Sequence, residues 1–204
     1  PPRTRPCSNH SRAEPAVSYV PSPFRLQAAV EALGSGGVVA CPTEAVWGLS
    51  CDPANEAAVS RVLALKQRPV SKGLILVAAD EDQFGFLLAD LPADQRRRLS
   101  DSWPGPFTWL VPHRNRVAAW IHGDHDTVAV RVSDHPVVRA LCLAWGGPLV
   151  STSANPGGAR PPVAAFQVRR YFGERLDAIL PGSVGGAGRP TVIRDLASDR
   201  VVRL

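Results

Sequence analysis

Long apolar runs are missing from the sequence. Nothing in its 204 residues approaches the roughly 20 consecutive apolar residues that a membrane-spanning helix needs, so we expect no membrane partner. Residues 1–20 mix Arg, Pro, Ser and His and contain no signal-peptide core. We therefore expect an N-terminal tail over residues 1–20 and a single domain over residues 21–204.

Cysteine is scarce and never occurs as a Cys-x-x-Cys pair. Cys41 and Cys142 lie in apolar runs, which favours buried free thiols in a reducing cytoplasm over a disulfide framework. A Cys41–Cys51 bridge remains an alternative. The turn His122-Gly123-Asp124-His125 contains metal-ligand residue types, but no third ligand is implied. We favour a polar turn there over a zinc site, and predict no metal held by the protein alone.

Lysine is nearly absent as well. Of the 23 basic residues only two, Lys66 and Lys72, are lysines. A GC-rich genome lets surface lysines drift to arginine, so two neighbouring lysines suggest a need for a compact ammonium group; chance clustering is the alternative. The net charge of +5 and a pI near 9.5 favour anionic partners such as nucleotides or RNA.

Backbone cradles for phosphate are also missing. The sequence has no Gly-x-x-x-x-Gly-Lys-Ser/Thr loop and no Gly-x-Gly-x-x-Gly turn after a strand. If a nucleotide binds, side chains must therefore hold its phosphates. The glycines of residues 182–188 do not open a helix, so this segment is expected to be a loop or a lid.

Apolar periodicity alternates between helix-like and strand-like segments, which predicts an α/β domain. Helices are expected over residues 24–33 and 56–67, as two short helices within 80–99 broken at Pro92, from a cap at Asp134 to residues 146–147, and over 162–172. Strands are expected over residues 38–41, 73–79, 107–111, 128–132, 148–151 and 191–195.

Three polar clusters lie at the ends or starts of these strands: Thr43-Glu44, Lys66-x-Arg68-x-x-x-Lys72 and Ser151-x-Ser153-x-Asn155. Ligands of α/β proteins gather at such edges, because loops there present side chains without breaking the core. The cations of the second cluster should repel one another unless an anion joins them; their alternative role is to complement a helix dipole. The third cluster suits a polyphosphate, a ribose or an amino acid, or else stabilises its own turn.

Other arginines are open to two interpretations. Arg131 lies in a strand between two valines and could hold a substrate carboxylate, or it could simply be exposed or paired. Residues 96–98 and 169–170 could contact RNA phosphates, although a solvated surface is the default interpretation of such runs.

Taken together, the clusters resemble the YrdC/TsaC family of threonylcarbamoyl-AMP synthases in its short, single-domain form. The Lys-x-Arg and Ser-x-Asn pairs that mark this family are Lys66/Arg68 and Ser153/Asn155. The resemblance covers roughly residues 24–195, and the segments that carry it are CPTEAVWGLSCDP (41–53), LKQRPVSKGLILVAA (65–79), WPGPFTWLVP (103–112), VAVRVSDHP (128–136) and PLVSTSANPGG (148–158).

The resemblance implies a twisted open sheet with helices on both faces, enclosing a basic cavity. It also implies the reaction of L-threonine, bicarbonate and ATP, with Mg²⁺ assisting, to give threonylcarbamoyl-AMP and pyrophosphate. Such a protein positions its reactants and neutralises phosphate charge rather than supplying a nucleophile. The product would pass to a TsaD/TsaB-type transferase that modifies A37 of tRNAs reading ANN codons. Binding of tRNA or double-stranded RNA and a monomeric state are further expectations.

Residue roles follow from the same resemblance. The expected catalytic set, Lys66, Arg68 and Lys72, handles the phosphates. Where long-form relatives carry a threonine-contacting histidine, this chain has Val77, so we expect a differently built threonine pocket. Contacts with ATP are implied for Arg68, Lys72, Thr108, Ser151, Asn155 and Arg194, and contacts with threonine for Thr43, Arg131, Ser153 and Thr191.

Two other functions are weighed against this one. A non-catalytic RNA-binding module would use its basic residues in bulk, so loss of Lys72 would only weaken binding in a salt-dependent way. A carbamoyl-adenylate enzyme of the hydrogenase-maturation type shares this domain, but it carries zinc motifs that are absent from the sequence.

Overall fold

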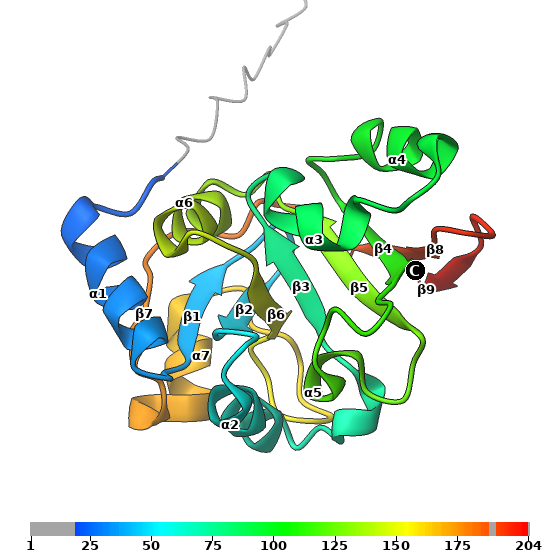
Figure 1. Ribbon diagram of the computed structural model, residues 1–204. Coiled ribbons are helices and arrows are strands. Elements are labelled where there is room, and N and C mark those ends of the chain that lie inside the picture. Colours follow the sequence, from blue (N-terminus) through cyan, green and yellow to red (C-terminus); the bar gives the residue numbers. More distant parts are fainter. Residues whose placement is uncertain (1–18, 188–190, 204) are drawn as a thin grey trace, which may run out of the picture.

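The computed structural model describes residues 19–187 and 191–203 (Figure 1). Most of the expected tail and part of the expected loop over residues 182–188 lie outside these residues. The helices are α1 (Pro23–Gly34), α2 (Glu56–Lys66), α3 (Gly85–Leu88), α4 (Ala93–Ser100), α5 (Ala119–His122), α6 (Pro136–Trp145) and α7 (Ala165–Phe172), with single turns η1 (Val70–Lys72), η2 (Asp82–Phe84) and η3 (Gly173–Arg175).

The strands form one sheet of mixed direction, which confirms the predicted α/β class. Within the described residues its order is β7-β1-β2-β6-β3-β5-β4-β8-β9. The strands are β1 (Val39–Pro42), β2 (Trp47–Ser50), β3 (Ile75–Ala78), β4 (Phe107–Pro112), β5 (Thr127–Val132), β6 (Leu149–Ser153), β7 (Ala178–Ile179), β8 (Val192–Asp195) and β9 (Val201–Arg203).

Helix boundaries follow local chemistry. Helix α2 begins after Asn55, whose side chain accepts a hydrogen bond from the amide of Ala58 at 3.0 Å, and it ends at Gln67 in a left-handed conformation. Helix α6 was expected to be capped by Asp134, and this prediction is wrong by one residue. Pro136 occupies the first turn and holds the preceding His135 in an extended conformation, so His135 is the cap.

Strand β2 was not predicted. It pairs antiparallel with β1 through a tight turn, in which the Thr43 amide and hydroxyl both donate to the carbonyl of Val46. Its sequence contains Gly48, which is unfavourable in a strand, and follows residues typical of a turn. Tertiary pairing on both sides, with β1 and β6, stabilises it nevertheless.

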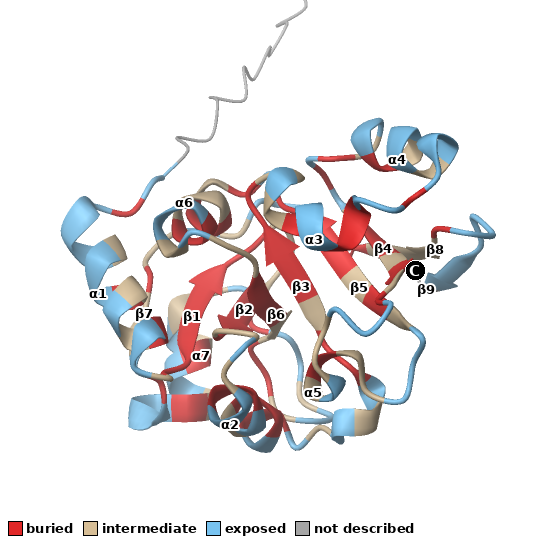
Figure 2. Ribbon diagram, in the orientation of Figure 1, coloured by how far each residue is buried: buried red, intermediate tan, exposed pale blue. Residues whose placement is uncertain are grey.

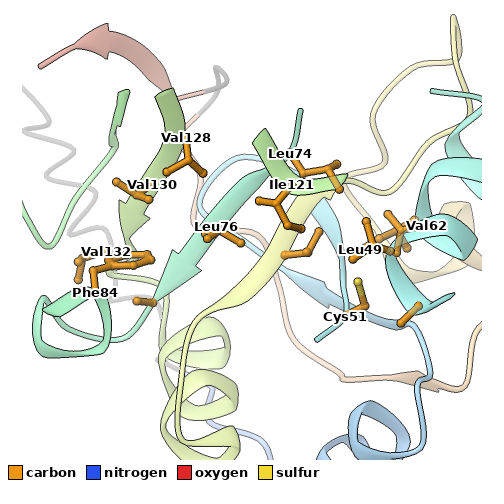
Figure 3. Close-up of a cluster of buried hydrophobic side chains, with 14 of the residues drawn as sticks. Leu49, Cys51, Val62, Leu74, Leu76, Phe84, Ile121, Val128, Val130 and Val132 are labelled. Atoms are coloured by element: carbon orange, nitrogen blue, oxygen red, sulfur yellow. The ribbon is translucent and has the colours of Figure 1, made fainter. Parts of the chain in front are cut away.

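One face of the sheet packs against helices. Val128, Val130 and Val132 alternate along β5 and join Leu76 of β3 in this layer (Figure 3). Figure 2 shows the outcome, with buried central strands and helices exposed on their outer sides. Helices α2, α3, α5 and α7 contribute the opposing side chains, among them Val62, Leu87, Ile121 and Phe172.

The opposite face is covered over only part of its width. Helices α1 and α6 pack there through a second apolar cluster that includes Val39, Val77 and Leu149. Val77 is 1% exposed because it lies under these helices. Its side chain therefore does not reach the uncovered part of the face. The remainder of the face, centred on β2, β6, β3 and β5, lines a cleft.

Cys41, Cys51 and Cys142 are buried and free, which confirms the predicted thiols for these three residues. Cys41 belongs to the cluster under α1 and α6, whereas Cys51 belongs to the cluster on the other face. Burial raises the pKa of the Cys41 and Cys51 thiols to about 12, so both are inert at neutral pH. No helix among the described residues is both long enough and apolar enough to span a membrane.

Candidate functional site

The cleft on the uncovered sheet face has a volume of about 340 Å³. It brings the three predicted polar clusters together, although they are far apart in the sequence. Thr43 comes from the first cluster, Lys66 and Arg68 from the second, and Ser151 and Ser153 from the third. The cleft is therefore the candidate functional site.

Strand register explains why these side chains share one face. Ser153 pairs with Gly48 of β2, and Ser151 pairs with Ile75 of β3. Directly paired residues point to the same side of a sheet, as do residues two apart along a strand. The hydroxyls of β6 therefore project into the cleft next to Ile75. Gly48 leaves room between them and the Thr43 methyl group, because an added Cβ there would lie 3.2 Å from that methyl carbon.

Lys66 is buried and holds the Ser153–Asn155 segment in place. Its ammonium donates to the backbone carbonyl of Ser153 and, at 3.0 Å, to that of Asn155. It also lies 3.3 Å from the Ser153 hydroxyl. Burial, with a smaller contribution from nearby Arg68, lowers the pKa of Lys66 to about 8. The expected catalytic lysine thus positions a wall of the cleft through backbone contacts.

Arg68 lines both the cleft and a second hollow of about 250 Å³. Its guanidinium donates to the carbonyls of Lys72 and Gly73, at 3.0 and 2.8 Å from Nη2. Lys72 is exposed and lines this second hollow, not the cleft. The two lysines of the sequence therefore serve different cavities.

Asn155 is 9% exposed and shapes the turn that follows β6. Its amide nitrogen donates to the carbonyls of Pro156 and Ala159, at 3.0 and 2.8 Å. Its side-chain oxygen is buried and has no hydrogen-bond partner among the described residues. Asn155 is not among the residues that line the cleft, so its expected contact with ATP would require this turn to adjust.

Arg131 and Glu44 form a buried ion pair beside the cleft. Arg131 Nη2 lies 3.4 Å from Glu44 Oε2, and the Ser133 hydroxyl donates to Glu44 Oε1 at 2.6 Å. Burial alone would raise the pKa of Glu44, but Arg131 and Ser133 outweigh it, so the pKa lies below its ordinary value. Arg131 lines the cleft, and its Nε has no hydrogen-bond partner among the described residues.

Two threonines complete this network. Thr191 lines the cleft and accepts a hydrogen bond from Arg131 Nη1 at 3.2 Å. Thr108 is fully buried behind it, with the two hydroxyl oxygens 3.2 Å apart. Thr108 therefore supports Thr191 and is not among the lining residues of the cleft.

The structure does not bring Arg194 to the cleft. In β8 it pairs with Trp109, whose side chain lies in the apolar layer on the opposite face. Its guanidinium sits over the Trp109 ring, 5.5 Å from the centroid, and lies 2.9 Å from Asp199 Oδ1. The Arg194 side chain thus contacts Trp109 and Asp199 on the face opposite the cleft. This geometry does not support the expected contact with ATP.

The described part of the glycine-rich segment packs against the turn of Thr43 and Glu44. The amide of Gly185 donates to the Thr43 carbonyl, and that of Ala187 to the Glu44 carbonyl, each at 3.0 Å. His135 Nε2 lies 3.0 Å from the carbonyl oxygen of Ser183. The segment therefore borders the Arg131–Glu44 pair.

Sequence reasoning missed the ion pair of Arg131 with Glu44 and the hydrogen bond from Ser133 to that carboxylate. Glu44 was noticed only as part of a polar cluster, and Ser133 was not singled out. Ser133 follows Arg131 by two residues, a spacing that places both on one face of a strand. A buried arginine also requires a carboxylate, so these two signals could have identified the network.

The chemistry available in the cleft is that of cations and hydroxyls. Among the described residues no group of three His, Cys, Asp or Glu side chains could hold a metal ion. The described lining of either cavity includes no carboxylate. A Mg²⁺ ion in this lining would have to bring most of its hard oxygen ligands with it.

The fold and the cleft define a mixed α/β protein with a site for a substrate carrying negative charge. The Sua5/YciO/YrdC family model, described as "Telomere recombination", matches residues 31–204. The chain belongs to this family.

Individual relatives agree with the family match. The threonylcarbamoyl-AMP synthase of Pseudomonas putida is 57% identical over 182 residues, which cover 89% of this chain and 98% of the relative. The structure of P. abyssi Sua5 complexed with L-threonine superposes with a TM-score of 0.82 at 30% identity, covering 88% of this chain and 54% of that one. E. coli YciO has the same fold, with a TM-score of 0.79 at 24% identity over 90% of this chain and 92% of that one.

Proposed function

We propose that this protein is a threonylcarbamoyl-AMP synthase, which converts L-threonine, bicarbonate and ATP into threonylcarbamoyl-AMP and pyrophosphate. The observation that carries the proposal is the convergence of Thr43, Lys66, Arg68, Arg131 and the Ser151/Ser153 hydroxyls in one cleft. The identity to relatives of that name over almost the whole domain supports it.

The reaction needs two charged reactants held in line. Bicarbonate loses water to give CO₂, which the threonine amine attacks to form a carbamate with loss of one amine proton; a carbamate oxygen then attacks the α-phosphorus of ATP. The bond to the bridging oxygen breaks, and pyrophosphate leaves with the electron pair. No covalent contribution from the protein is required, so positioning and charge neutralisation are its main tasks. A cleft of cations and hydroxyls suits both tasks.

Arg131 is the proposed partner of the threonine carboxylate. It lines the cleft beside the hydroxyls of Thr43, Ser151 and Thr191, and its Nε keeps an unused hydrogen-bond donor. Glu44 holds the guanidinium from behind. A guanidinium fixed in this way can present a planar pair of donors to a carboxylate.

Arg68 is the proposed partner of the ATP phosphates, with Lys72 further along. When Mg²⁺ binds with ATP, it neutralises part of the phosphate charge. The product is a mixed anhydride and would pass to a transferase of the TsaD/TsaB type for modification of A37 in tRNA. Direct contact with that complex or with tRNA, a monomeric state and a cytoplasmic location belong to the same proposal.

The test is pyrophosphate release in the presence of ATP, Mg²⁺, bicarbonate and L-threonine. Omission of threonine or bicarbonate should abolish release, and Lys72→Ala should lose product while its circular dichroism is unchanged. Pyrophosphate release that does not depend on threonine and bicarbonate would refute the proposal. A Lys72→Ala variant that only binds RNA more weakly, in a salt-dependent way, would favour the RNA-binding module instead.

A further inference from the structure

We propose that His135 is a positioning residue for the threonine side of the cleft. Its buried side chain fixes residues 181–187, here called the strap, against the turn that carries Thr43 and Glu44. This inference rests on the proposed function, because it assigns a role in threonine binding. His135 belongs to none of the three polar clusters, and the reaction as described above does not use it.

The backbone of His135 is tied to the ion pair beside the cleft. Pro136 holds His135 in an extended conformation at the start of α6. The His135 amide donates to the Ser133 hydroxyl at 3.1 Å, and that hydroxyl donates to Glu44 Oε1 at 2.6 Å. Glu44 in turn pairs with Arg131. The histidine therefore has a fixed place relative to the cleft.

The side chain of His135 reaches the strap. It is 6% exposed, and its Nε2 lies 3.0 Å from the carbonyl oxygen of Ser183. A carbonyl oxygen can only accept, so Nε2 carries the proton and donates. The Nδ1 atom is buried and has no hydrogen-bond partner among the described residues. The carbonyl of Ser183 thus satisfies the donor of a buried imidazole, which would be costly to leave unpaired.

Two backbone hydrogen bonds continue this contact to the wall of the cleft. The amides of Gly185 and Ala187 donate to the carbonyls of Thr43 and Glu44, each at 3.0 Å. The approach is close, because a Cβ on Gly185 would lie 3.1 Å from the Glu44 carbonyl oxygen and 3.5 Å from His135 Cδ2. The strap, held by His135, therefore holds the Thr43–Glu44 turn.

These contacts lie on the proposed threonine side of the cleft. Thr43 lines the cleft, and Glu44 holds Arg131, the proposed partner of the threonine carboxylate. On the proposed phosphate side, Lys66 donates to the carbonyls of residues 153 and 155, and Arg68 to those of residues 72 and 73. A loosened strap should therefore disturb threonine binding and leave ATP binding nearly unchanged.

His135 acts through this turn and not on the reactants. It is not among the residues that line the cleft. Its Nε2 proton is already donated to the Ser183 carbonyl. Direct removal of a proton from the threonine amine is therefore not the role that this geometry gives it.

Steady-state pyrophosphate release, with threonine and ATP varied in turn, tests this role. His135→Leu removes the donor and should raise KM for threonine about tenfold, as loss of one buried hydrogen bond can do, while KM for ATP stays within about twofold. His135→Gln keeps an N–H donor and should restore KM for threonine to within about threefold of the wild-type value. The matched control Ser183→Ala removes only an exposed hydroxyl, keeps the carbonyl, and should leave both KM values unchanged.

Because His135 is buried, urea unfolding is measured for each variant, and Gly185→Ala tests the strap independently. Its new carbon would press on the Glu44 carbonyl and should also raise KM for threonine several-fold. An unchanged KM for threonine in folded His135→Leu, or in Gly185→Ala where His135→Leu does not fold, would overturn the role. Equal rises in both KM values, or a His135→Gln variant no better than His135→Leu, would overturn it as well. Wild-type pyrophosphate release that needs no threonine would instead count against the proposed function.

Discussion

The Lys66 ammonium lies 3.0 Å from the backbone carbonyl oxygen of Asn155 and also donates to the carbonyl of Ser153. The two sequence pairs that mark the family, Lys-x-Arg and Ser-x-Asn, are thus joined physically. The amide of Gly157 adds a hydrogen bond to the Lys66 carbonyl at 2.8 Å. The end of α2 and the segment after β6 therefore form one unit.

This contact predicts an unusual titration. Because burial and Arg68 lower the pKa of Lys66 to about 8, its ammonium should lose its proton as the pH rises through 8. Only two lysines exist in the chain, so NMR of protein labelled at lysine should show two side-chain signals. One signal should move with a midpoint near 8, and it should persist in Lys72→Arg. Absence of any lysine titration near 8 would contradict the buried contact.

Removal of the carboxylate that faces Arg131 should lower the free energy of unfolding. Glu44→Gln leaves a buried guanidinium without its counter-charge, which typically destabilises a protein by about 3 kcal/mol or more. Urea denaturation at neutral pH measures this difference. Glu174→Gln, at an exposed position in η3, is the control and should change the unfolding free energy by less than about 0.5 kcal/mol.

The same pair gives a pH dependence of defined sign. The pKa of Glu44 lies below its ordinary value of 4.5. Its contribution to stability is therefore present above pH 4.5 and is lost as the pH falls through the lower, folded-state value. Glu44→Gln should lose less stability than the wild type on acidification below pH 4.5. Parallel curves for the two proteins would argue against the ion pair.

Gly48 should matter for binding more than for folding. In Gly48→Ala the new methyl group would lie 3.2 Å from the Thr43 methyl carbon and 3.8 Å from the Ser151 hydroxyl. We expect KM for threonine to rise about tenfold, because a misplaced methyl in a close-fitting site has effects of this size. The control Gly85→Ala has no atom within 4 Å of the new carbon and should leave KM unchanged. Equal KM values in both variants would contradict the placement of the cleft.

Gly123 should matter for folding. Gly123→Ala combines a positive φ with a Cβ that would lie 2.4 Å from the Ser71 carbonyl oxygen, so the unfolding free energy should fall by about 2 kcal/mol or more. Gly147→Ala, whose new carbon meets nothing within 4 Å, is the matched control. Thermal denaturation of the two variants measures this difference. Similar midpoints would refute the close approach of Gly123 to the backbone of Ser71.

The sequence alone predicted the α/β class, and a helix or strand lies in every segment where it expected one. It also selected the three clusters that meet in the cleft, because their positions at strand ends follow from periodicity. It could not predict strand β2, which depends on pairing with β1 and β6. Nor could it predict that Arg194 faces Trp109, because the side to which a strand residue points is set by its register with a neighbouring strand.

The roles of Lys66 and Lys72 show the same limit. Their spacing in the sequence suggested one phosphate cluster. Helix α2, however, ends at Lys66 and points its side chain into the segment after β6, whereas the turn η1 carries Lys72 to the neighbouring hollow. Side-chain direction at a helix end depends on tertiary contacts that no local pattern encodes.

The most direct test of the proposed function follows the bicarbonate carbon into the product. The protein should be incubated with ¹³C-bicarbonate, L-threonine, ATP and Mg²⁺, and the nucleotide products should be analysed at once by mass spectrometry. We predict an adenylate that contains one ¹³C atom together with threonine, formed in equal amount to pyrophosphate. An adenylate of threonine without the labelled carbon, or pyrophosphate formed without any threonine-containing adenylate, would contradict this account.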